Sequence, residues 1–204
     1  MGTVKAARNP KTQAVLPLRG KVLNVGKNGI DKWSKNQEIL DIIQSIGIGY
    51  GDNIEIEKRR YEKIIIATDA DFDGFHIRIL LLTLFITLMP ELIEKGHIYV
   101  AMPPLYTISY KSEMYYALDD KELNEFNRTH PSGEKTICYL KGLGEMSAKS
   151  FSDTVLNENR RRLKQITMKD AAYASKMFED LMGKEVEPRK EFLFANGAKA
   201  NLDI

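Results

Sequence analysis

The sequence is short of the residues from which several common sites are built. It has one cysteine, Cys138, among 204 residues, which excludes an internal disulfide and a cysteine-built metal site. Its three histidines, His76, His97 and His130, share no metal-ligand spacing. The longest apolar run, residues 79–89, is shorter than the about 20 residues that a membrane-spanning helix needs. No signal-peptide pattern is present near the N-terminus, so we expect a cytoplasmic protein with no membrane partner.

The sequence also lacks a large excess of either charge, because 30 Lys and Arg residues offset 28 Asp and Glu residues to a net charge of +2. The basic residues are nevertheless clustered. Each cluster alone is typical of a solvated surface, but together they favour a polyanionic partner, because Lys and Arg neutralise phosphates and release counterions. The clusters are Lys5, Arg8, Lys11, Arg19 and Lys21; Lys58, Arg59 and Arg60; and Arg160, Arg161, Arg162 and Lys164.

What the sequence does have is three aspartates at alternate positions, Asp69, Asp71 and Asp73, soon after a β-branched run at residues 64–66. A short run of this kind predicts a buried strand, and the glycine after the last aspartate permits a turn. The apolar stretch that follows predicts a helix over residues 75–89, ended by a proline. The carboxylates would then lie at the carboxyl end of a parallel-type strand, where open α/β sheets place their ligands.

Three carboxylates this close together repel one another unless a cation cancels their charge. All-oxygen ligands favour Mg²⁺ or Ca²⁺, and Mg²⁺ is typically held by one or two carboxylates together with phosphate oxygens of a substrate. The pattern therefore predicts a divalent metal site at Asp69, Asp71 and Asp73, with a solvated acidic turn as the alternative. An EF-hand is excluded, because counting from Asp69 puts Leu80 at the twelfth position, where a bidentate Glu is required.

The chain before this strand predicts two extended pieces around a Pro/Gly bend at residues 13–25, and then one helix. Ser34 and Gln37 have capping-box spacing, and Gly47 suits the end of the helix. The glycine-containing loop 47–52 follows no strand, so it is not predicted to bind a nucleotide.

The chain after the acidic segment predicts strands, short helices and a boundary. The Pro/Gly loop at residues 127–135 predicts two domains, residues 1–126 and 127–204. The fold class is therefore α/β, with an open, mainly parallel sheet flanked by helices and a mostly helical C-terminal tail. The other expected elements are strands at 97–102 and 136–140, a hairpin of 105–110 with 114–118, a helix from Asp119 or Asp120 to 126, and tail helices from 169 to 181, ended by Gly183, and from about Pro188.

Five motifs, taken in order along the chain, resemble the C-terminal half of the gyrase B and topoisomerase IV B subunits. The resemblance covers practically the whole chain and includes the terminal N-L-D-I. The motifs are P-L-R-G-K-V-L-N at 17–24, I-I-I-A-T-D-A-D-F-D-G-F-H-I-R at 64–78, P-P-L-Y at 103–106, K-G-L-G-E-M at 141–146 and L-M-G-K-E-V-E-P-R-K-E-F at 181–192.

The resemblance implies a TOPRIM domain plus tail that acts on duplex DNA with a breakage-reunion (A-type) subunit, which supplies the tyrosine nucleophile. It implies Mg²⁺ as the cofactor, with Mn²⁺ or Ca²⁺ as substitutes. The bound Mg²⁺ would be held at the scissile phosphate while the partner's tyrosine cleaves and rejoins the DNA. Carried over by position, it makes Asp69 and Asp71 metal ligands and Asp73 a supporting catalytic acid. It makes Lys21 and Asn24 DNA-contacting positions, with Arg19 as a further DNA candidate.

The chain departs from the family pattern in two respects. The family's E-G-D-S-A motif, whose Glu is a metal ligand, and its ATP-binding half are not in the sequence, and no G-x-x-x-x-G-K-[ST] motif is present. We therefore expect no nucleotide-binding residue here, inactivity of the chain alone, and ATP use only through a separate ATPase-half polypeptide that carries the missing Glu. The alternative is a catalytically incomplete remnant that binds DNA or partner subunits.

A second resemblance belongs to another class of enzyme. The segment Asp71-Phe72-Asp73-Gly74 is similar to the first motif of haloacid-dehalogenase-like phosphatases, in which the first Asp is a nucleophile. Phe75 stands where that family usually has Thr or Val. This alternative leaves the other four motifs unexplained.

Overall fold

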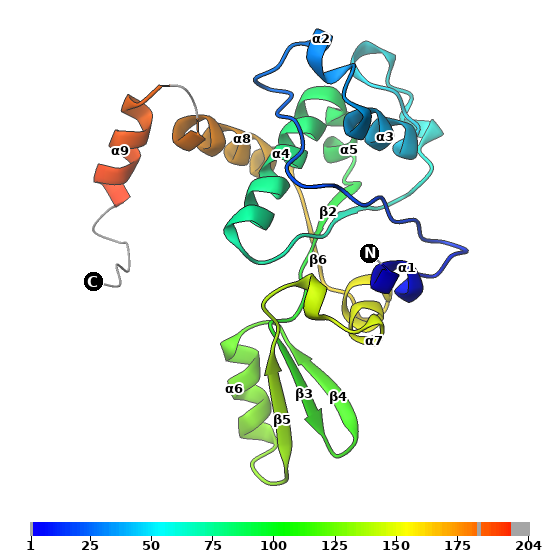
Figure 1. Ribbon diagram of the computed structural model, residues 1–204, viewed down its shortest axis with the longest axis vertical. Helices are drawn as coiled ribbons and strands as arrows, with labels where there is room; N and C mark the ends of the chain where they lie inside the picture. The colour runs from blue at the N-terminus through cyan, green and yellow to red at the C-terminus, as the bar shows by residue number, and fades with distance from the viewer. Residues whose placement is uncertain (1, 183–184, 197–204) are drawn as a thin grey trace.

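The computed structural model describes residues 2–182 and 185–196. An α/β body, built on one three-stranded sheet, carries a second three-stranded sheet on one side (Figure 1). The elements are α1 Gly2–Ala7, α2 Ile30–Trp33, α3 Gln37–Ile46, η1 Gly51–Asn53, η2 Ile56–Lys58, β1 Ile64–Ile66, α4 Phe72–Leu88, α5 Pro90–Glu94, β2 Ile98–Ala101, β3 Tyr106–Tyr110, β4 Glu113–Ala117, α6 Asp120–Thr129, β5 Lys135–Tyr139, η3 Leu143–Glu145, α7 Ala148–Phe151, η4 Ser152–Leu156, β6 Leu163–Gln165, α8 Met168–Met182 and α9 Glu187–Asn196.

The sheet of the body has the strand order β1-β2-β6. The β1 and β2 strands are parallel, with Ile64 opposite Ile98, as the β-branched run predicted. The β6 strand lies antiparallel on the other side of β2, so this sheet is mixed, where mainly parallel pairing was expected. The α/β class is confirmed. No local pattern indicated β6, a three-residue strand that β2 pairs with over a long sequence distance.

The apolar helix α4 begins three residues earlier than predicted, at Phe72. The Asp71 carboxylate caps it by accepting a hydrogen bond from the Gly74 N–H at 2.7 Å, which satisfies one of the unpaired donors of the first turn. Gly74 is thus inside the helix. A Cβ there would lie 2.2 Å from the Asp69 carbonyl oxygen, so the glycine is required for close approach of the backbone and not for a turn.

The α3 helix is capped by a residue other than the predicted one. The Asn36 side chain accepts a hydrogen bond from the Ile39 N–H at 3.1 Å, whereas Ser34 is the C-cap residue of α2. Gly47 ends α3 with a φ of 87°, as expected for a left-handed C-cap. One face of the helix buries four isoleucines, Ile39, Ile42, Ile43 and Ile46, in the main core.

The second sheet has the order β4-β3-β5, with all pairs antiparallel. The hairpin turns at Lys111 and Ser112, whose positive φ values of 48° and 67° suit a two-residue type I′ connection. The α6 helix, capped by Asp119, is held on the sheet by an aromatic cluster in which Phe126 stacks on His130 at 4.3 Å and contacts Tyr110. Cys138 is exposed on β5.

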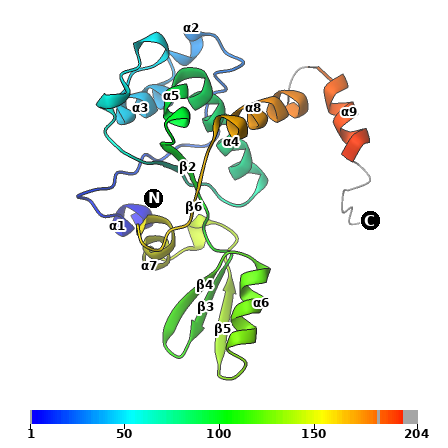
Figure 2. The ribbon, with the colours of Figure 1, turned by 180° about the vertical axis from the view of Figure 1, so that it is seen from behind.

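The second-sheet unit, defined as residues 106–139, joins the body through two adjacent stems. The Leu140 N–H donates to the Leu105 carbonyl at 2.8 Å, so the chain leaves and re-enters the body at one place, below β2 (Figures 1 and 2). The predicted boundary between residues 126 and 127 falls inside α6, and β5 pairs with β3 across it. Secondary structure therefore runs continuously across that position.

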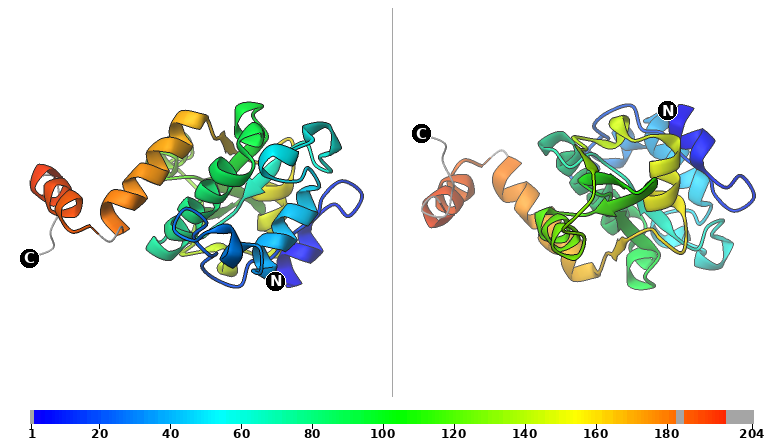
Figure 3. Two further views of the ribbon diagram at one scale, coloured as in Figure 1. Left: turned by 90° about the horizontal axis from the view of Figure 1, so that it is seen from above. Right: turned by 90° about the horizontal axis from the view of Figure 1, so that it is seen from below.

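The C-terminal helices complete the body and then leave it. The α8 helix packs against α4 and α5, with Ala171 fully buried in the main core. The α9 helix contacts α8 and lies away from the rest of the body (Figure 3). Pro188 is in the first turn of α9, as predicted, while Gly183 and the N-L-D-I terminus lie outside the described residues. No helix within residues 2–182 and 185–196 is long and apolar enough to cross a membrane.

Candidate metal and DNA site

The segment that leaves β1 and enters the first turn of α4 presents all three predicted aspartates on the surface. Asp69, Asp71 and Asp73 are each exposed, because the chain leaves the buried strand end at Ile66 before α4 enters the core. Each carboxylate is held by a different partner. The three contacts bring in backbone from the start of α4, the loop at residues 141–146, and a lysine from the N-terminal segment.

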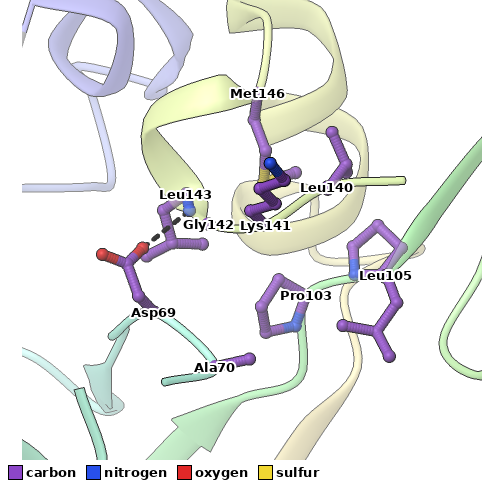
Figure 4. Close-up of a pocket in the computed structure, with 10 residues that line it drawn as sticks. Asp69, Ala70, Pro103, Leu105, Leu140, Lys141, Gly142, Leu143 and Met146 are labelled. Atoms are coloured by element: carbon purple, nitrogen blue, oxygen red, sulfur yellow. Dashed lines mark hydrogen bonds between the residues drawn. The ribbon is translucent and has the colours of Figure 1, made fainter. Parts of the chain in front are cut away.

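Asp69 is tied to a loop that lies far from it in sequence. Its Oδ1 accepts a hydrogen bond from the Leu143 N–H at 2.7 Å, and Figure 4 shows this contact between the first of the three aspartates and the loop that follows β5. The two segments and the prolines after β2 line a partly open pocket of about 10 Å³, near the space that one water molecule needs. The lining includes Pro103, Leu105, Gly142 and Met146.

Asp73 forms an ion pair with Lys21 across 2.7 Å. The hydrogen bond and charge of the Lys21 ammonium lower the pKa of Asp73 below its ordinary value. His76, one turn further along α4, has a lowered pKa because it is partly buried and close to Lys21. The pair therefore keeps Asp73 ionised, and its carboxylate is bound to the Lys21 ammonium.

The three carboxylates do not form a ready three-ligand cluster. Within the described ranges, no group of three or more His, Cys, Asp and Glu side chains is positioned to hold one metal ion. The donor set of Asp69 and Asp71 nevertheless suits Mg²⁺. Each residue has one oxygen fixed by a backbone N–H, and its Oδ2 has no hydrogen-bond partner among the described residues. Mg²⁺ commonly uses one or two carboxylates and completes its shell with water and phosphate oxygens.

Of the three predicted DNA-contacting residues, the structure brings only Lys21 into contact with the acidic segment. Asn24 organises its own turn, because its Oδ1 accepts hydrogen bonds from the Gly26 and Lys27 N–H groups at 2.9 and 3.2 Å. Arg19 has an exposed side chain, and its backbone N–H is bound by Glu38 at 2.8 Å.

Two further features of the site were not predicted. Gly142 and Leu143 contact Asp69, a partnership between residues too far apart in sequence to leave a local signal. Arg78, from the second turn of α4, donates to the Thr68 hydroxyl at 3.1 Å, and its buried Nε has no hydrogen-bond partner among the described residues. Partial burial lowers the pKa of Arg78. The only sequence signal for a role of Arg78 was its charge within a mostly apolar helix, four residues after Gly74.

Comparison with known proteins gives two family matches that together cover most of the chain. The Toprim domain family model matches residues 1–103, and the family described as DNA gyrase B subunit, carboxyl terminus, matches residues 133–194. The first match spans the three aspartates and the predicted DNA-contacting residues, and the second spans β5, the 141–146 loop and the C-terminal helices.

Individual relatives agree with these matches over the full chain. The chain is 46% identical over 204 residues to the DNA gyrase B subunit of Treponema denticola. It is 45% identical over the same length to the DNA gyrase B subunits of Staphylococcus epidermidis and Staphylococcus aureus. In each case the alignment includes 100% of this chain and 32% of the relative, so the chain spans about a third of the length of these curated relatives.

Proposed function

The chain belongs to the Toprim family, joined to the carboxyl-terminal segment of DNA gyrase B subunits, and on this premise we propose that it is the metal-binding part of a type II DNA topoisomerase, an isomerase acting on duplex DNA. The observation that carries the proposal is the pair Asp69 and Asp71 in the segment that leads from β1 to α4, each with one oxygen fixed by a backbone N–H. Identity of 45% to a gyrase B subunit over all 204 residues of this chain supports it.

In this proposal, Asp69 and Asp71 hold Mg²⁺, with Asp73 as the supporting acid. Bound there, the cation supplies Lewis-acid stabilisation of the charge that develops on the scissile phosphate. Mn²⁺ and Ca²⁺ are the proposed substitutes, because both are bound by oxygen ligands. The role of the chain's own residues is to fix the carboxylates at the strand end before DNA arrives, which limits the reorganisation needed during the reaction.

The attacking tyrosine comes, in our proposal, from a breakage-reunion (A-type) partner subunit. None of the nine tyrosines of this chain matches a nucleophile of the family. The chain then positions and polarises the phosphate, and the partner forms and breaks the covalent bond to DNA.

Lys21 is the proposed DNA contact that links the duplex to the acidic segment, with Asn24 and Arg19 beside it in sequence. Its ammonium now pairs with Asp73, and both side chains are exposed, so a DNA phosphate can replace the carboxylate at little cost. That exchange would release Asp73 to act beside Asp69 and Asp71. DNA binding and completion of the acidic site would therefore occur together.

The relatives extend well beyond the aligned part, which is 32% of their length. We propose that ATP is bound and hydrolysed outside these 204 residues, in a separate ATPase half that also supplies the acidic-motif Glu as a further ligand. The assembly would act in the cytoplasm.

A catalytically incomplete DNA- or partner-binding remnant is the second candidate. It is favoured by the lack of a three-ligand cluster among the described residues. The dehalogenase-like alternative has no comparable support, because the Toprim match covers the segment on which it was based, and Asp71 caps α4 with the carboxylate that would be the nucleophile.

The two candidates are separated by reconstitution. The chain is mixed with an A-type subunit, with and without an ATPase-half polypeptide ending in the acidic motif, and Mg²⁺-dependent cleavage of supercoiled plasmid is measured. We expect cleavage only in the three-part mixture. Folding and partner binding without cleavage in any mixture would favour the remnant.

In the active mixture, Asp69→Ala should lower the cleavage rate roughly 100- to 1000-fold, the size of effect seen when one group that stabilises transition-state charge is removed. DNA affinity, measured by fluorescence anisotropy, should change little. The matched control is Asp52→Ala, which removes an exposed carboxylate in η1. Normal cleavage by Asp69→Ala at ordinary Mg²⁺ concentrations would contradict the proposed metal site.

A further inference from the structure

The loop at residues 141–146 contacts Asp69. It directly follows Leu140, the stem through which the chain re-enters the body from the second-sheet unit. It is closed on itself, because the Lys141 N–H donates to the Glu145 carboxylate at 2.9 Å and the Glu145 N–H donates to the Gly142 carbonyl at 3.2 Å. Met146 anchors its end in a small core cluster at 4% exposure. The loop therefore presents the Leu143 N–H to Asp69 from a fixed position.

The lack of a side chain at Gly142 leaves room for the Asp69 carboxylate in its present orientation. Its φ of −166° and ψ of 173° are extended values that any residue adopts, so its backbone conformation does not demand glycine. A Cβ at this position, however, would lie 2.9 Å from Asp69 Oδ1 and 3.1 Å from its carboxyl carbon. Gly144, two residues later in the same loop, would place a Cβ in open space, with nothing within 4 Å.

We propose that Gly142 and Leu143 are positioning residues for the metal ligand Asp69. The Leu143 N–H holds Oδ1, the missing Cβ of Gly142 leaves room for the carboxylate in that orientation, and Oδ2 is kept available for the cation. Groups that orient a ligating side chain commonly tune metal affinity in this way. The inference rests on the proposed function, because it takes Asp69 as a ligand.

The same contact assigns a role to the position of the second-sheet unit. Its two stems, at Leu105 and Leu140, hydrogen-bond to each other beside the Asp69 contact. The segment that orients the metal ligand is therefore fixed by the base of this unit, although its strands and α6 extend away from the body (Figure 1).

The test is metal affinity, read without any turnover. Mn²⁺ binding to the three-part assembly is titrated in the absence of ATP and DNA, using the electron paramagnetic resonance signal of free Mn²⁺, and Asp69→Ala defines the site of interest. Gly142→Ala should weaken Mn²⁺ binding at that site roughly 10- to 100-fold, as loss of an orienting partner does elsewhere. Gly144→Ala, the matched control, should bind as the unaltered chain does.

A second variant removes the donor in place of adding a clash. Leu143→Pro deletes the N–H at the first position of η3, where proline is compatible with a helical turn and Gly142 is already extended. It should weaken Mn²⁺ binding to a similar degree, and circular dichroism would establish that both variants remain folded.

The outcomes distinguish the positioning role of Gly142 and Leu143 from the proposed metal site at Asp69. If Asp69→Ala abolishes a Mn²⁺ site that Gly142→Ala and Leu143→Pro leave at full affinity, the positioning role is overturned and the metal site stands. If Asp69→Ala changes no Mn²⁺ binding, the metal site itself is overturned, and the positioning role with it.

Discussion

The ion pair of Lys21 and Asp73 is the clearest residue-scale feature with a measurable consequence. Its atoms are 2.7 Å apart, yet the side chains are 50% and 74% exposed. Pairs this exposed contribute little to folding stability, because water and salt screen them. The pair therefore occupies the Asp73 carboxylate reversibly and contributes little to the stability of the fold.

The pKa of Asp73 should be measurably below its ordinary value, because the Lys21 ammonium hydrogen-bonds to its carboxylate. A depressed pKa means that the pair's small contribution to stability is present above the unfolded-state pKa, about pH 4, and is lost as pH falls through the folded-state value. Carbon-13 NMR titration of the side-chain carboxyl would measure it.

Lys21→Met should return the Asp73 pKa towards its ordinary value, whereas Lys11→Met, which removes an exposed charge from the same N-terminal segment, should not. Equal pKa values in the unaltered chain and Lys21→Met would show that the pair does not exist in solution.

At the scale of single elements, the capping residues at the helix ends have effects on stability that can be measured. The capping contact at Asn36 begins α3, and this helix supplies four isoleucines to the main core. A change in the cap should therefore appear in the stability of the whole chain.

Asn36→Ala should lower the free energy of unfolding by about 1 kcal/mol, because the Ile39 N–H loses its acceptor. Ser34→Ala, at the residue with the capping-box spacing, should change it by less than about 0.5 kcal/mol, as surface substitutions usually do. Urea denaturation followed by circular dichroism measures both. A larger loss for Ser34→Ala would restore Ser34 as the cap.

The comparison of caps shows what sequence could and could not predict. Local patterns located the strand at residues 64–66, the hairpin at 106–117 and the Gly47 C-cap, because each depends on neighbouring residues. They misplaced the start of α4, because Gly74 in a first turn looks like Gly74 in a loop until the Asp69 backbone is seen against it.

Long-range pairing lay beyond local patterns altogether. The β6 strand exists because β2 offers it a partner. The contact of Asp69 with Leu143 joins residues on either side of the second-sheet unit. The acidic residues were thus predictable as candidates, whereas their separate partners, Leu143, Gly74 and Lys21, emerged only from the fold.

At the scale of the whole molecule, the two sheets differ in how much buried packing surrounds them. The main core runs through the body and includes Leu84, Leu92 and Ile98, each fully buried. In the second-sheet unit, α6 buries no residue and β5 is largely exposed. The aromatic cluster around Phe126 supplies much of its packing.

Amide hydrogen exchange should therefore be faster in residues 106–139 than in residues 64–101, because units with little buried apolar surface open at lower free energy. We expect backbone amides of β3 to exchange at least about tenfold faster than those of β2 after correction for intrinsic rates. Mass spectrometry of peptic peptides measures this difference, with α4 peptides as the protected internal reference. Equal protection in both sheets would mean that they open as one cooperative unit.

The packing of α8 on α4 has a consequence for biosynthesis. The α4 helix is apolar on nearly every side, and the element that covers one of those sides, α8, follows β6 near the C-terminal end of the described chain. A ribosome adding about 5 to 20 residues per second would leave that side of α4 uncovered for roughly 5 to 20 seconds after the helix emerges. During translation, α4 thus exposes apolar surface that is open to aggregation and to chaperone binding until α8 has been made.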